Sequence, residues 1–202
     1  MVWSCLVSIL PGMAQTEKLT DYVNPFVGTD GYGNVYPGAQ IPFGGIQISP
    51  DTDSRFYDAA SGYKYNHLTL MGFSLTHLSG TGIPDLGDIL FIPGTGEMKL
   101  EPGTHEDPDQ GYRSRYSHDK EWASPNYYAV ELADYGVKAE MTSGVRSGMF
   151  RFTYPESDNA FIMIDMNHTL WQSCEWSNLR MINDSTITGY KLVKGWGPER
   201  HV

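Results

Sequence analysis

The chain has 202 residues and a formal net charge of −10, from 14 basic and 24 acidic side chains, and this length fits one domain. Its acidity argues against a nucleic-acid or anionic-membrane partner, because phosphate groups are bound mainly by surplus lysine and arginine. The 40% apolar share, with 13% aromatic residues, excludes disorder throughout, and no apolar run approaches the roughly 20 residues that span a bilayer.

The first 15 residues form an apolar stretch that ends in small residues, like the second half of a secretory signal with its cleavage site. A positively charged start is missing, since the first basic residue is Lys18. A disordered apolar tail or a misassigned start is the alternative. We therefore expect a leader at 1–15, one domain at 20–202 and a secreted or periplasmic protein. The two cysteines, Cys5 and Cys174, are too few for a disulfide framework.

Turn-forming residues fill the segment 23–50, which indicates a tightly packed loop that feeds short strands. Within it, alternation at 46–48 predicts the first strand. Residues 89–92 are a short apolar run, and we expect a buried strand there that ends at Pro93. The acidic, proline-bearing stretch at 97–111 predicts a surface loop.

The second half of the chain has a clear β pattern. Two half-buried alternating runs at 127–132 and 137–142 are separated by a turn and predict a hairpin. Further strands are predicted at 147–154, 161–166 and 186–193. Short strands with almost no helical period indicate an all-β fold, an antiparallel β-sandwich or barrel with few short helices. The chain stops soon after the last strand, so we expect the sandwich to be incomplete at its C-terminal end.

A glycine-rich loop at 28–38 is the first candidate for ligand contact. It lacks the Gly-Lys-Ser/Thr ending and the following helix of a phosphate loop. Its backbone amides can come close to a sugar or to a facing domain. The alternative is a set of turns that only folds the chain back on itself. Asp30, Gly31, Tyr32 and Asn34 are its substrate-binding candidates.

Three more substrate-binding candidates, Tyr57, Tyr63 and His77, lie in polar and irregular surroundings. Tyrosine rings offer flat faces on which sugars can stack. His77 lies in a stretch rich in glycine, serine and threonine, where an imidazole can donate to a sugar hydroxyl. The alternatives are core packing for the tyrosines and, for His77, an interior histidine bonded to local backbone.

Catalytic and metal-binding patterns are missing from the sequence. The densest carboxylate pairs, Asp51 with Asp53 and Asp85 with Asp88, lack the spacing of a calcium hand, and turn capping is their simpler role. The six histidines include no His-Glu-x-x-His pattern, which argues against zinc. From the residues alone we predict no catalytic residue and no metal ligand in this chain.

Several distinctive strings follow one another along the chain. They are YVNPFVGT at 22–29, YPGAQIPFG at 36–44, QISPDT at 47–52, SGYKY at 61–65 and GFSLTHLSGTG at 72–82, with shorter strings at 87–88, 116–118, 127–128 and 146–148. Together they resemble the opening of glycoside hydrolase family 92, the calcium-dependent exo-acting α-mannosidases. The resemblance covers the chain from Tyr22 to Trp196.

The resemblance implies an amino-terminal β-sandwich that, in whole enzymes, packs against a larger helical (α/α)-barrel domain, with the active site at their junction. It implies that the general acid, the general base and most calcium ligands lie on that helical domain. It also implies an inverting mechanism, in which two carboxyl groups leave room for an attacking water. The expected partners are a mannose-containing glycan and the helical catalytic domain, and the expected cofactor of the whole enzyme is calcium.

Some positions depart from the family pattern. Tyr32, Asn34 and Leu75 stand where the family often carries histidines, and residues 56–60 lack the tryptophan and cysteine that commonly precede Ser-Gly-Tyr. Leaving-group and linkage preference are therefore open. Two hypotheses follow. The chain is an amino-terminal fragment of a secreted α-mannosidase, inactive by itself, or it is a stand-alone carbohydrate-binding β-sandwich domain that uses the same loops.

Overall fold

The computed structural model describes residues 17–54, 59–196 and 199–202. The strand pairings within these ranges are antiparallel, and the prediction of an all-β antiparallel fold is confirmed. The helical turns are short 3₁₀ segments, η1 (Leu19–Tyr22), η3 (Pro108–Gln110) and η4 (His118–Lys120). No helix in the described ranges is both long and apolar enough to cross a membrane. The expected leader at 1–15 lies outside them.

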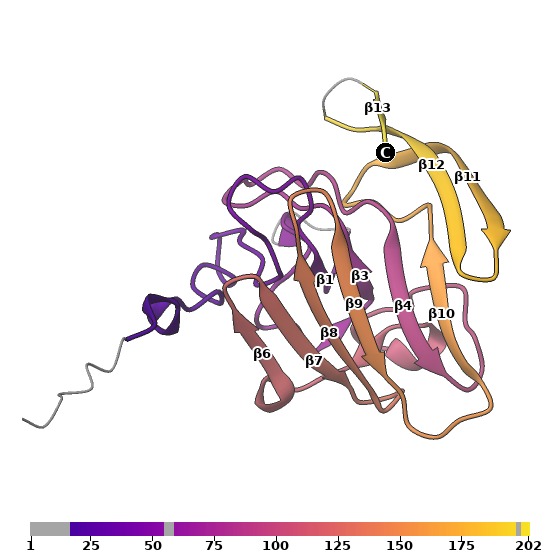
Figure 1. The fold of residues 1–202 in the computed structure, drawn as a ribbon, viewed down its shortest axis with the longest axis horizontal. Helices are drawn as coiled ribbons and strands as arrows, with labels where there is room; N and C mark the ends of the chain where they lie inside the picture. Colours follow the sequence, from indigo (N-terminus) through magenta and orange to yellow (C-terminus); the bar gives the residue numbers. More distant parts are fainter. Residues whose placement is uncertain (1–16, 55–58, 197–198) are drawn as a thin grey trace, which may run out of the picture.

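Two four-stranded sheets form the body of the molecule (Figure 1). The first sheet has the order β1-β3-β4-β10 and the second the order β6-β7-β8-β9. Their strands are β1 (Ser49–Asp51), β3 (Gly72–Ser74), β4 (Leu90–Thr95), β10 (Ala160–Asp165), β6 (Glu121–Ser124), β7 (Tyr127–Leu132), β8 (Val137–Ser143) and β9 (Gly148–Thr153). A separate small pair is formed by β2 (Thr69–Leu70) and β5 (Ser114–Arg115).

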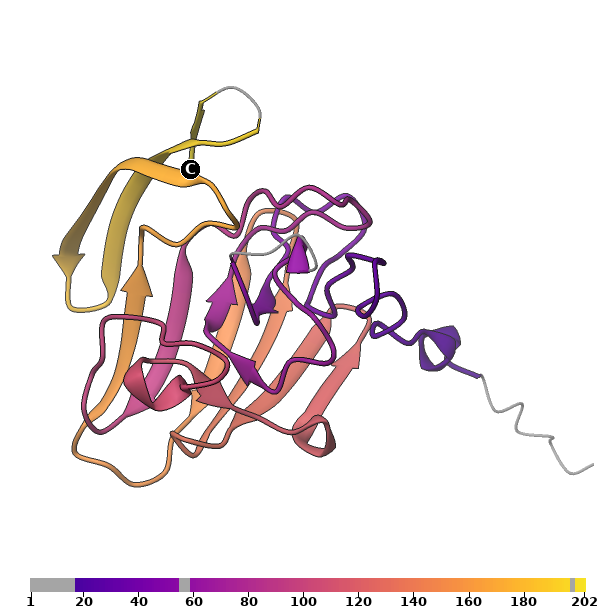
Figure 2. The ribbon, with the colours of Figure 1, turned by 180° about the vertical axis from the view of Figure 1, so that it is seen from behind.

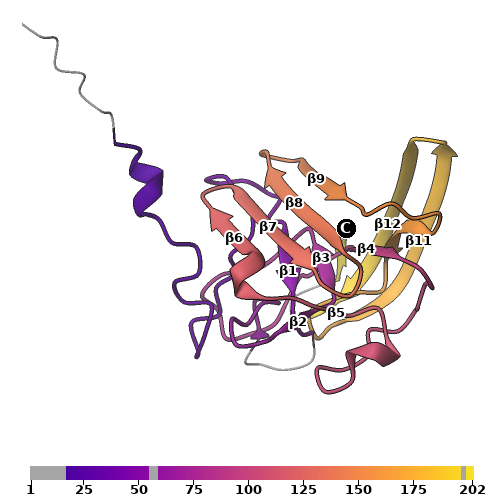
Figure 3. The same ribbon diagram turned by 90° about the horizontal axis from the view of Figure 1, so that it is seen from below.

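Period-two alternation decides which face of each sheet is buried. Val130 of β7 and Ala139 of β8 point inward and belong to the same apolar cluster as Phe73 of the first sheet. The ring of Phe91 in β4 lies 5.0 Å from the ring of Phe150 in β9, so aromatic side chains bridge the two sheets. Figure 3 shows the two sheets as facing layers. The sandwich is thus held by apolar burial, at about 1.5–3 kcal/mol for each large side chain.

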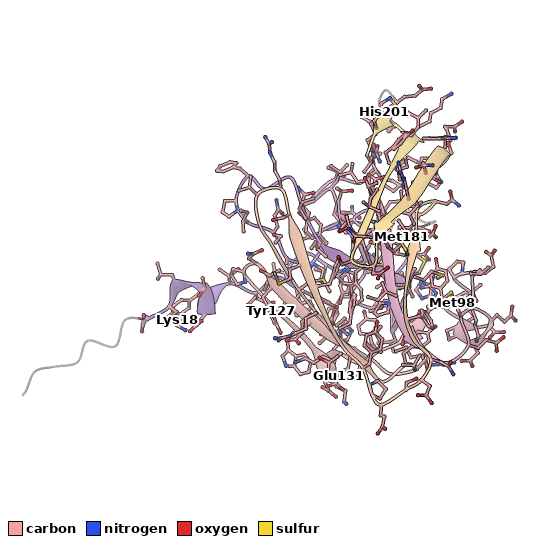
Figure 4. All side chains as sticks on the ribbon, turned by 45° about the vertical axis from the view of Figure 1, so that its right-hand side comes forward. Lys18, Met98, Tyr127, Glu131, Met181 and His201 are labelled. Atoms are coloured by element: carbon pink, nitrogen blue, oxygen red, sulfur yellow. The ribbon has the colours of Figure 1, made fainter. Side chains whose placement is uncertain are left out.

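A long hairpin extends beyond the sandwich next to β10. It consists of β11 (Ser173–Asn183) and β12 (Thr186–Lys194), with the short β13 (Arg200–His201) at the edge of β12 (Figures 1 and 2). Most of its side chains are exposed, among them Met181, which is labelled in Figure 4. Exposure of apolar side chains on a two-stranded ribbon indicates a surface that is available for contact with other polypeptide.

A buried ion cluster anchors the base of this hairpin. Lys191 is fully buried, and its Nζ donates to the His168 carbonyl at 2.5 Å and lies 3.3 Å from Asp88 Oδ1. Arg200 lies 2.5 Å from Asp85 and 3.2 Å from Asp88. Burial lowers the pKa of Lys191, against the raising effect of Asp88. The carboxylate pair of Asp85 and Asp88 is therefore engaged in structural ion pairs.

Two strand boundaries differ from the sequence prediction. The first strand begins at Ser49, because Ile48 forms only an isolated bridge with Ala39. The expected end of the next long strand at Pro93 is wrong, since β4 continues to Thr95. A strand tolerates proline where no neighbouring strand needs its N–H as a hydrogen-bond donor. β3 pairs with β4 only at Phe91, so no residue of β3 pairs with Pro93.

The strands predicted from residue 127 onward are present as β7, β8, β9, β10 and β12. The sequence prediction missed β11, the longest strand that the structure describes. Its burial pattern is mostly exposed on both faces, so it carries no alternation of apolar and polar residues that would have revealed it.

Candidate functional site

The glycine-rich loop presents an exposed ring on a braced backbone. The Asp30 carboxylate accepts the Gly31 N–H at 2.7 Å, and Gly31 has φ +59°, a left-handed conformation that glycine adopts readily. The Gly31 carbonyl accepts the Lys64 ammonium at 2.5 Å. Lys64 Nζ also lies 5.9 Å from the centre of the Tyr32 ring, which is 93% exposed. The loop thus holds an aromatic face toward solvent beside a buried cation.

Asn34 connects this loop to the segment just after His77, at Gly80. Its side-chain Nδ2 donates to the Tyr32 carbonyl at 3.2 Å, and its main-chain carbonyl accepts a hydrogen bond from the Gly80 N–H at 2.7 Å. Asn34 adopts φ +51°, a region in which asparagine is several-fold enriched among residues other than glycine. Two loops that are distant in sequence therefore share one surface region.

A buried carboxylate holds two histidines beneath the connecting loops. Asp51, in β1, has no exposed surface. Its Oδ1 lies 2.8 Å from His77 Nε2, and its Oδ2 lies 2.7 Å from His168 Nε2. The other ring nitrogen of His77, Nδ1, is 2.7 Å from the Gln47 carbonyl. One carboxylate thus ties together β1, the loop after β3 and the connection from β10 to β11.

The partners of His77 fix its charge. A carbonyl can only accept, so Nδ1 donates to Gln47, and Nε2 must carry a second proton toward an ionised Asp51. Burial by itself raises the pKa of Asp51, but the charge of His77 and the hydrogen bonds from His77 and His168 outweigh it and hold that pKa well below its usual range. An Asp51 carboxylate with a His77 imidazolium therefore satisfies every contact, and His168 is the neutral donor to the same carboxylate.

A second buried carboxylate lies at the start of β6. The Tyr63 and Tyr128 hydroxyls donate to Glu121 Oε1 at 2.9 and 2.5 Å. His118 Nδ1 donates to Glu121 Oε2 at 2.6 Å, while its Nε2 donates to the Tyr65 carbonyl at 2.7 Å. The Tyr65 ring stacks on the His118 ring with their centres 3.9 Å apart. This network fixes the segment 63–65, which includes the lysine that braces the glycine-rich loop.

We expect Tyr63→Phe to lower the free energy of unfolding by about 1.5–3 kcal/mol, because it removes a hydrogen bond to a buried charged acceptor. Burial, followed by the charges of Tyr116 and Glu121, raises the pKa of Tyr63 far above its ordinary value, so the hydroxyl remains a donor. Urea unfolding measures the change. Tyr32→Phe is the matched control, because Tyr32 is 93% exposed, and equal losses for the two variants would contradict the role of Glu121.

Four of the seven predicted site residues come together at the surface: Asp30, Gly31, Tyr32 and Asn34. Tyr63 and His77 lie in the interior, where each is bonded to a buried carboxylate. They support the loops and do not form part of their exposed face. Tyr57 lies outside the described residues.

Sequence reasoning missed two residues that shape this region, Lys64 and His168. Lys64 had a signal, since it lies inside the Ser-Gly-Tyr-Lys-Tyr string beside a candidate tyrosine. His168 had none, because 117 positions separate it from Asp51, and only the folded sheet brings the two side chains together.

The described residues contain no group of three or more histidine, cysteine, aspartate or glutamate side chains that could hold a metal ion. The physical reason is visible at the buried carboxylates: Asp51 is saturated by two imidazoles, and Asp88 by Lys191 and Arg200. The described residues therefore do not fit a calcium site, which needs six to eight oxygen ligands.

An antiparallel β-sandwich whose connecting loops gather exposed polar and aromatic groups is a scaffold found among carbohydrate-recognising proteins. Residues 22–202 match the Glycosyl hydrolase family 92 N-terminal domain. The chain therefore belongs to glycosyl hydrolase family 92, as an N-terminal domain of that family.

Solved structures and a curated relative agree with this assignment. The family GH92 α-mannosidase BT3965 from Bacteroides thetaiotaomicron is 99% identical over 92% of this chain, with a TM-score of 0.91. The GH92 family glycosyl hydrolase ccman5 is 29% identical over 88% of this chain, with a TM-score of 0.72. An uncharacterized secreted glycosidase of Arthroderma benhamiae is 29% identical over 145 residues, 68% of this chain. The chain spans 25%, 24% and 17% of these three proteins, respectively.

Proposed function

We propose that this chain is the substrate-facing amino-terminal part of a secreted, exo-acting α-mannosidase that hydrolyses mannose-containing glycans with inversion. The observation that carries the proposal is the 99% identity to a GH92 α-mannosidase over 92% of the chain. A further structure of that relative is a complex with mannoimidazole. The chain spans 25% of that relative, and we place the general acid and base on polypeptide outside the described ranges.

The geometry gives this chain two tasks. The loop at 30–34, with the exposed Tyr32 ring, contacts the sugar. The exposed apolar side chains of the β11–β12 hairpin, among them Leu179 and Ile187, form a surface for the helical catalytic domain. Aromatic and backbone groups on a rigid sandwich recognise a neutral sugar without catalysing its hydrolysis.

Calcium dependence is part of the proposal for the whole enzyme, and the ligands would come from outside the described residues. A bound calcium ion would supply a positive charge that polarises sugar hydroxyls. What this chain contributes is position: the loops are fixed by Asp51, Glu121 and Lys64, so that substrate contacts need little ordering on binding. Secretion is proposed because the Arthroderma relative is described as secreted.

The test uses a full-length enzyme that carries this domain. It should release mannose from an α-linked mannobiose, with the β-anomer appearing first in proton NMR spectra, and a chelator should abolish the activity. The isolated 202-residue chain should bind sugar weakly and release none. Mannose release by the isolated chain would show that the catalytic acids lie within it, contrary to the proposal.

We expect Lys64→Met to raise KM for an α-mannoside about tenfold in the full-length enzyme, because the ammonium that fixes the Gly31 carbonyl is lost and the loop is misplaced. Hydrogen exchange at residues 30–34 should become faster. Lys138→Met is the matched control, since Lys138 also lies near an aromatic ring, 5.7 Å from that of Trp122, on another face. Faster hydrogen exchange at residues 30–34 with an unchanged KM would contradict a role of this loop in substrate binding.

A further inference from the structure

A polar cavity of about 560 Å³ lies beside the connection from β10 to β11. Its wall includes Asp165 at the end of β10, Asn167, His168, Trp171 and Gln172 from that connection, and also Tyr112. The volume falls within the roughly 300–1,000 Å³ that small-molecule sites occupy. None of these residues was a candidate for substrate binding on sequence grounds, and the cavity does not include the glycine-rich loop.

His168 presents a hydrogen-bond acceptor at this wall. Its Nε2 donates to Asp51 Oδ2 at 2.7 Å. The Asp51 charge is already balanced by the His77 imidazolium, so His168 is neutral and its Nδ1 carries a lone pair. Nδ1 has no hydrogen-bond partner among the residues that the structure describes. The buried carboxylate thus orients an imidazole whose second nitrogen is ready to accept a proton donor.

Gln172 fixes the shape of the same wall. Its Nε2 donates to the Pro84 carbonyl at 2.7 Å, and since a carbonyl can only accept, this contact fixes the orientation of the amide. The other atom of the amide, Oε1, is buried and has no partner within the described ranges. Because Oε1 is buried, the amide serves as a fixed part of the wall, and His168 is the group that offers an acceptor to a ligand.

Trp171 is held in an unfavourable backbone conformation at the same place. It has φ +69°, which is rare for a bulky side chain, and is 53% exposed. The turn around it is fixed on both sides: the Thr169 hydroxyl donates to the Gln172 carbonyl at 2.8 Å, and the buried Leu170 donates its N–H to the Leu86 carbonyl at 2.9 Å. Strain of this kind persists where the surroundings impose it, and it concentrates at ligand sites.

We propose that this cavity is a subsite for a neutral hexose unit of the glycan, with a hydroxyl that donates to His168 Nδ1 while the Trp171 ring covers the apolar face of the sugar. The oriented imidazole acceptor and the nearby Asp165 carboxylate require a ligand rich in donors, and they disfavour an anion. A pyranose meets both conditions, because it carries several hydroxyl donors and a flat C–H face. The identity of the sugar as mannose rests on the proposed function.

Trp171→Gly is the informative variant, made in a full-length enzyme that carries this domain. Glycine favours the positive φ, so the melting temperature should be equal or higher, while the stacking ring is lost. We expect KM for an α-linked mannotetraose to rise about 3- to 10-fold and kcat to stay unchanged. Trp122→Ala, on the outer face of β6, is the control for an exposed tryptophan.

Calorimetry with the mannotetraose separates this subsite from the proposed activity. If the wild-type enzyme hydrolyses no α-mannoside, the proposed function fails, and weaker sugar binding by Trp171→Gly would still support the subsite. Wild-type KM and affinity in Trp171→Gly would overturn the subsite. A lower melting temperature for Trp171→Gly with unchanged KM would also overturn it, because that pattern belongs to a packing role.

Discussion

Replacement of Gly62 by alanine is expected to destabilise the domain by about 2–5 kcal/mol. Gly62 has φ +86°, and a Cβ there would lie 2.1 Å from Asp51 Oδ1 and 3.2 Å from His77 Cδ2. The left-handed backbone costs an L-residue about 1–2 kcal/mol, and forcing a methyl group into packed surroundings costs about 1–3 kcal/mol more. The Asp51 carboxylate cannot move away without losing its contacts with two imidazoles.

Gly80→Ala separates strain from collision in this experiment. Gly80 has φ +74°, and a Cβ at this position would meet no atom within 4 Å. Its alanine variant should therefore lose only the backbone term, about 1–2 kcal/mol. Urea unfolding of the two variants measures the difference. Equal losses at Gly62 and Gly80 would contradict a tight fit of the chain around the Asp51 carboxylate.

The sequence predicted the fold best where one face of a strand meets water. From residue 127 onward, apolar and polar residues alternate because each sheet has one buried and one exposed face, and four of the predicted strands lie in these sheets. The rule fails for β11, whose two faces are both largely exposed. It also fails at Pro93, where the strand continues because β3 has already ended. The alternation of apolar and polar residues indicates which face of a strand is buried. It carries no information about where a neighbouring strand ends.

The sequence predicted the surface loop of the candidate site, but it did not predict which residues are buried beneath the loops and hold them in place. Glycine and polar residues at 28–34 revealed a loop able to present backbone and side-chain groups, and the structure gathers four candidates there. Tyr63 and His77 carry the same residue types, but their hydrogen-bond partners, Glu121 and Asp51, draw them into the interior. Which tyrosine or histidine faces solvent depends on such long-range partners, and these are set by topology.

The Asp51 network also links the two surface regions that we assign to sugar contact. Through His77 it fixes the loop that meets Asn34 at Gly80, and through His168 it fixes the wall of the cavity near Trp171. One buried carboxylate therefore sets the relative position of both regions. A change at Asp51 should affect the stability of the domain and the geometry of both surfaces together.

Asp51→Ala should lower the free energy of unfolding by about 3–5 kcal/mol, because it leaves a buried imidazolium without its counter-charge. Asp51→Asn should cost less at neutral to alkaline pH. Its amide can donate to an unprotonated His77 Nε2 and accept from His168 Nε2, so every contact is kept with two neutral imidazoles. Asp109→Asn, at an exposed ion pair with Arg115, is the control and should change stability little.

The pH dependence distinguishes the carboxylate from its amide replacement. The folded pKa of Asp51 is depressed, so its contribution to stability is fully present above the unfolded value, about 3.9, and is lost as the pH falls below it. In Asp51→Asn a proton added to His77 would face an amide donor and favour the unfolded chain. As the pH falls, the variant should therefore begin to lose stability at a higher pH than the wild type does. The loss should occur through the range in which ordinary imidazoles gain a proton. Urea unfolding between about pH 2 and pH 8 measures both curves, and parallel curves would rule out a charged Asp51–His77 pair.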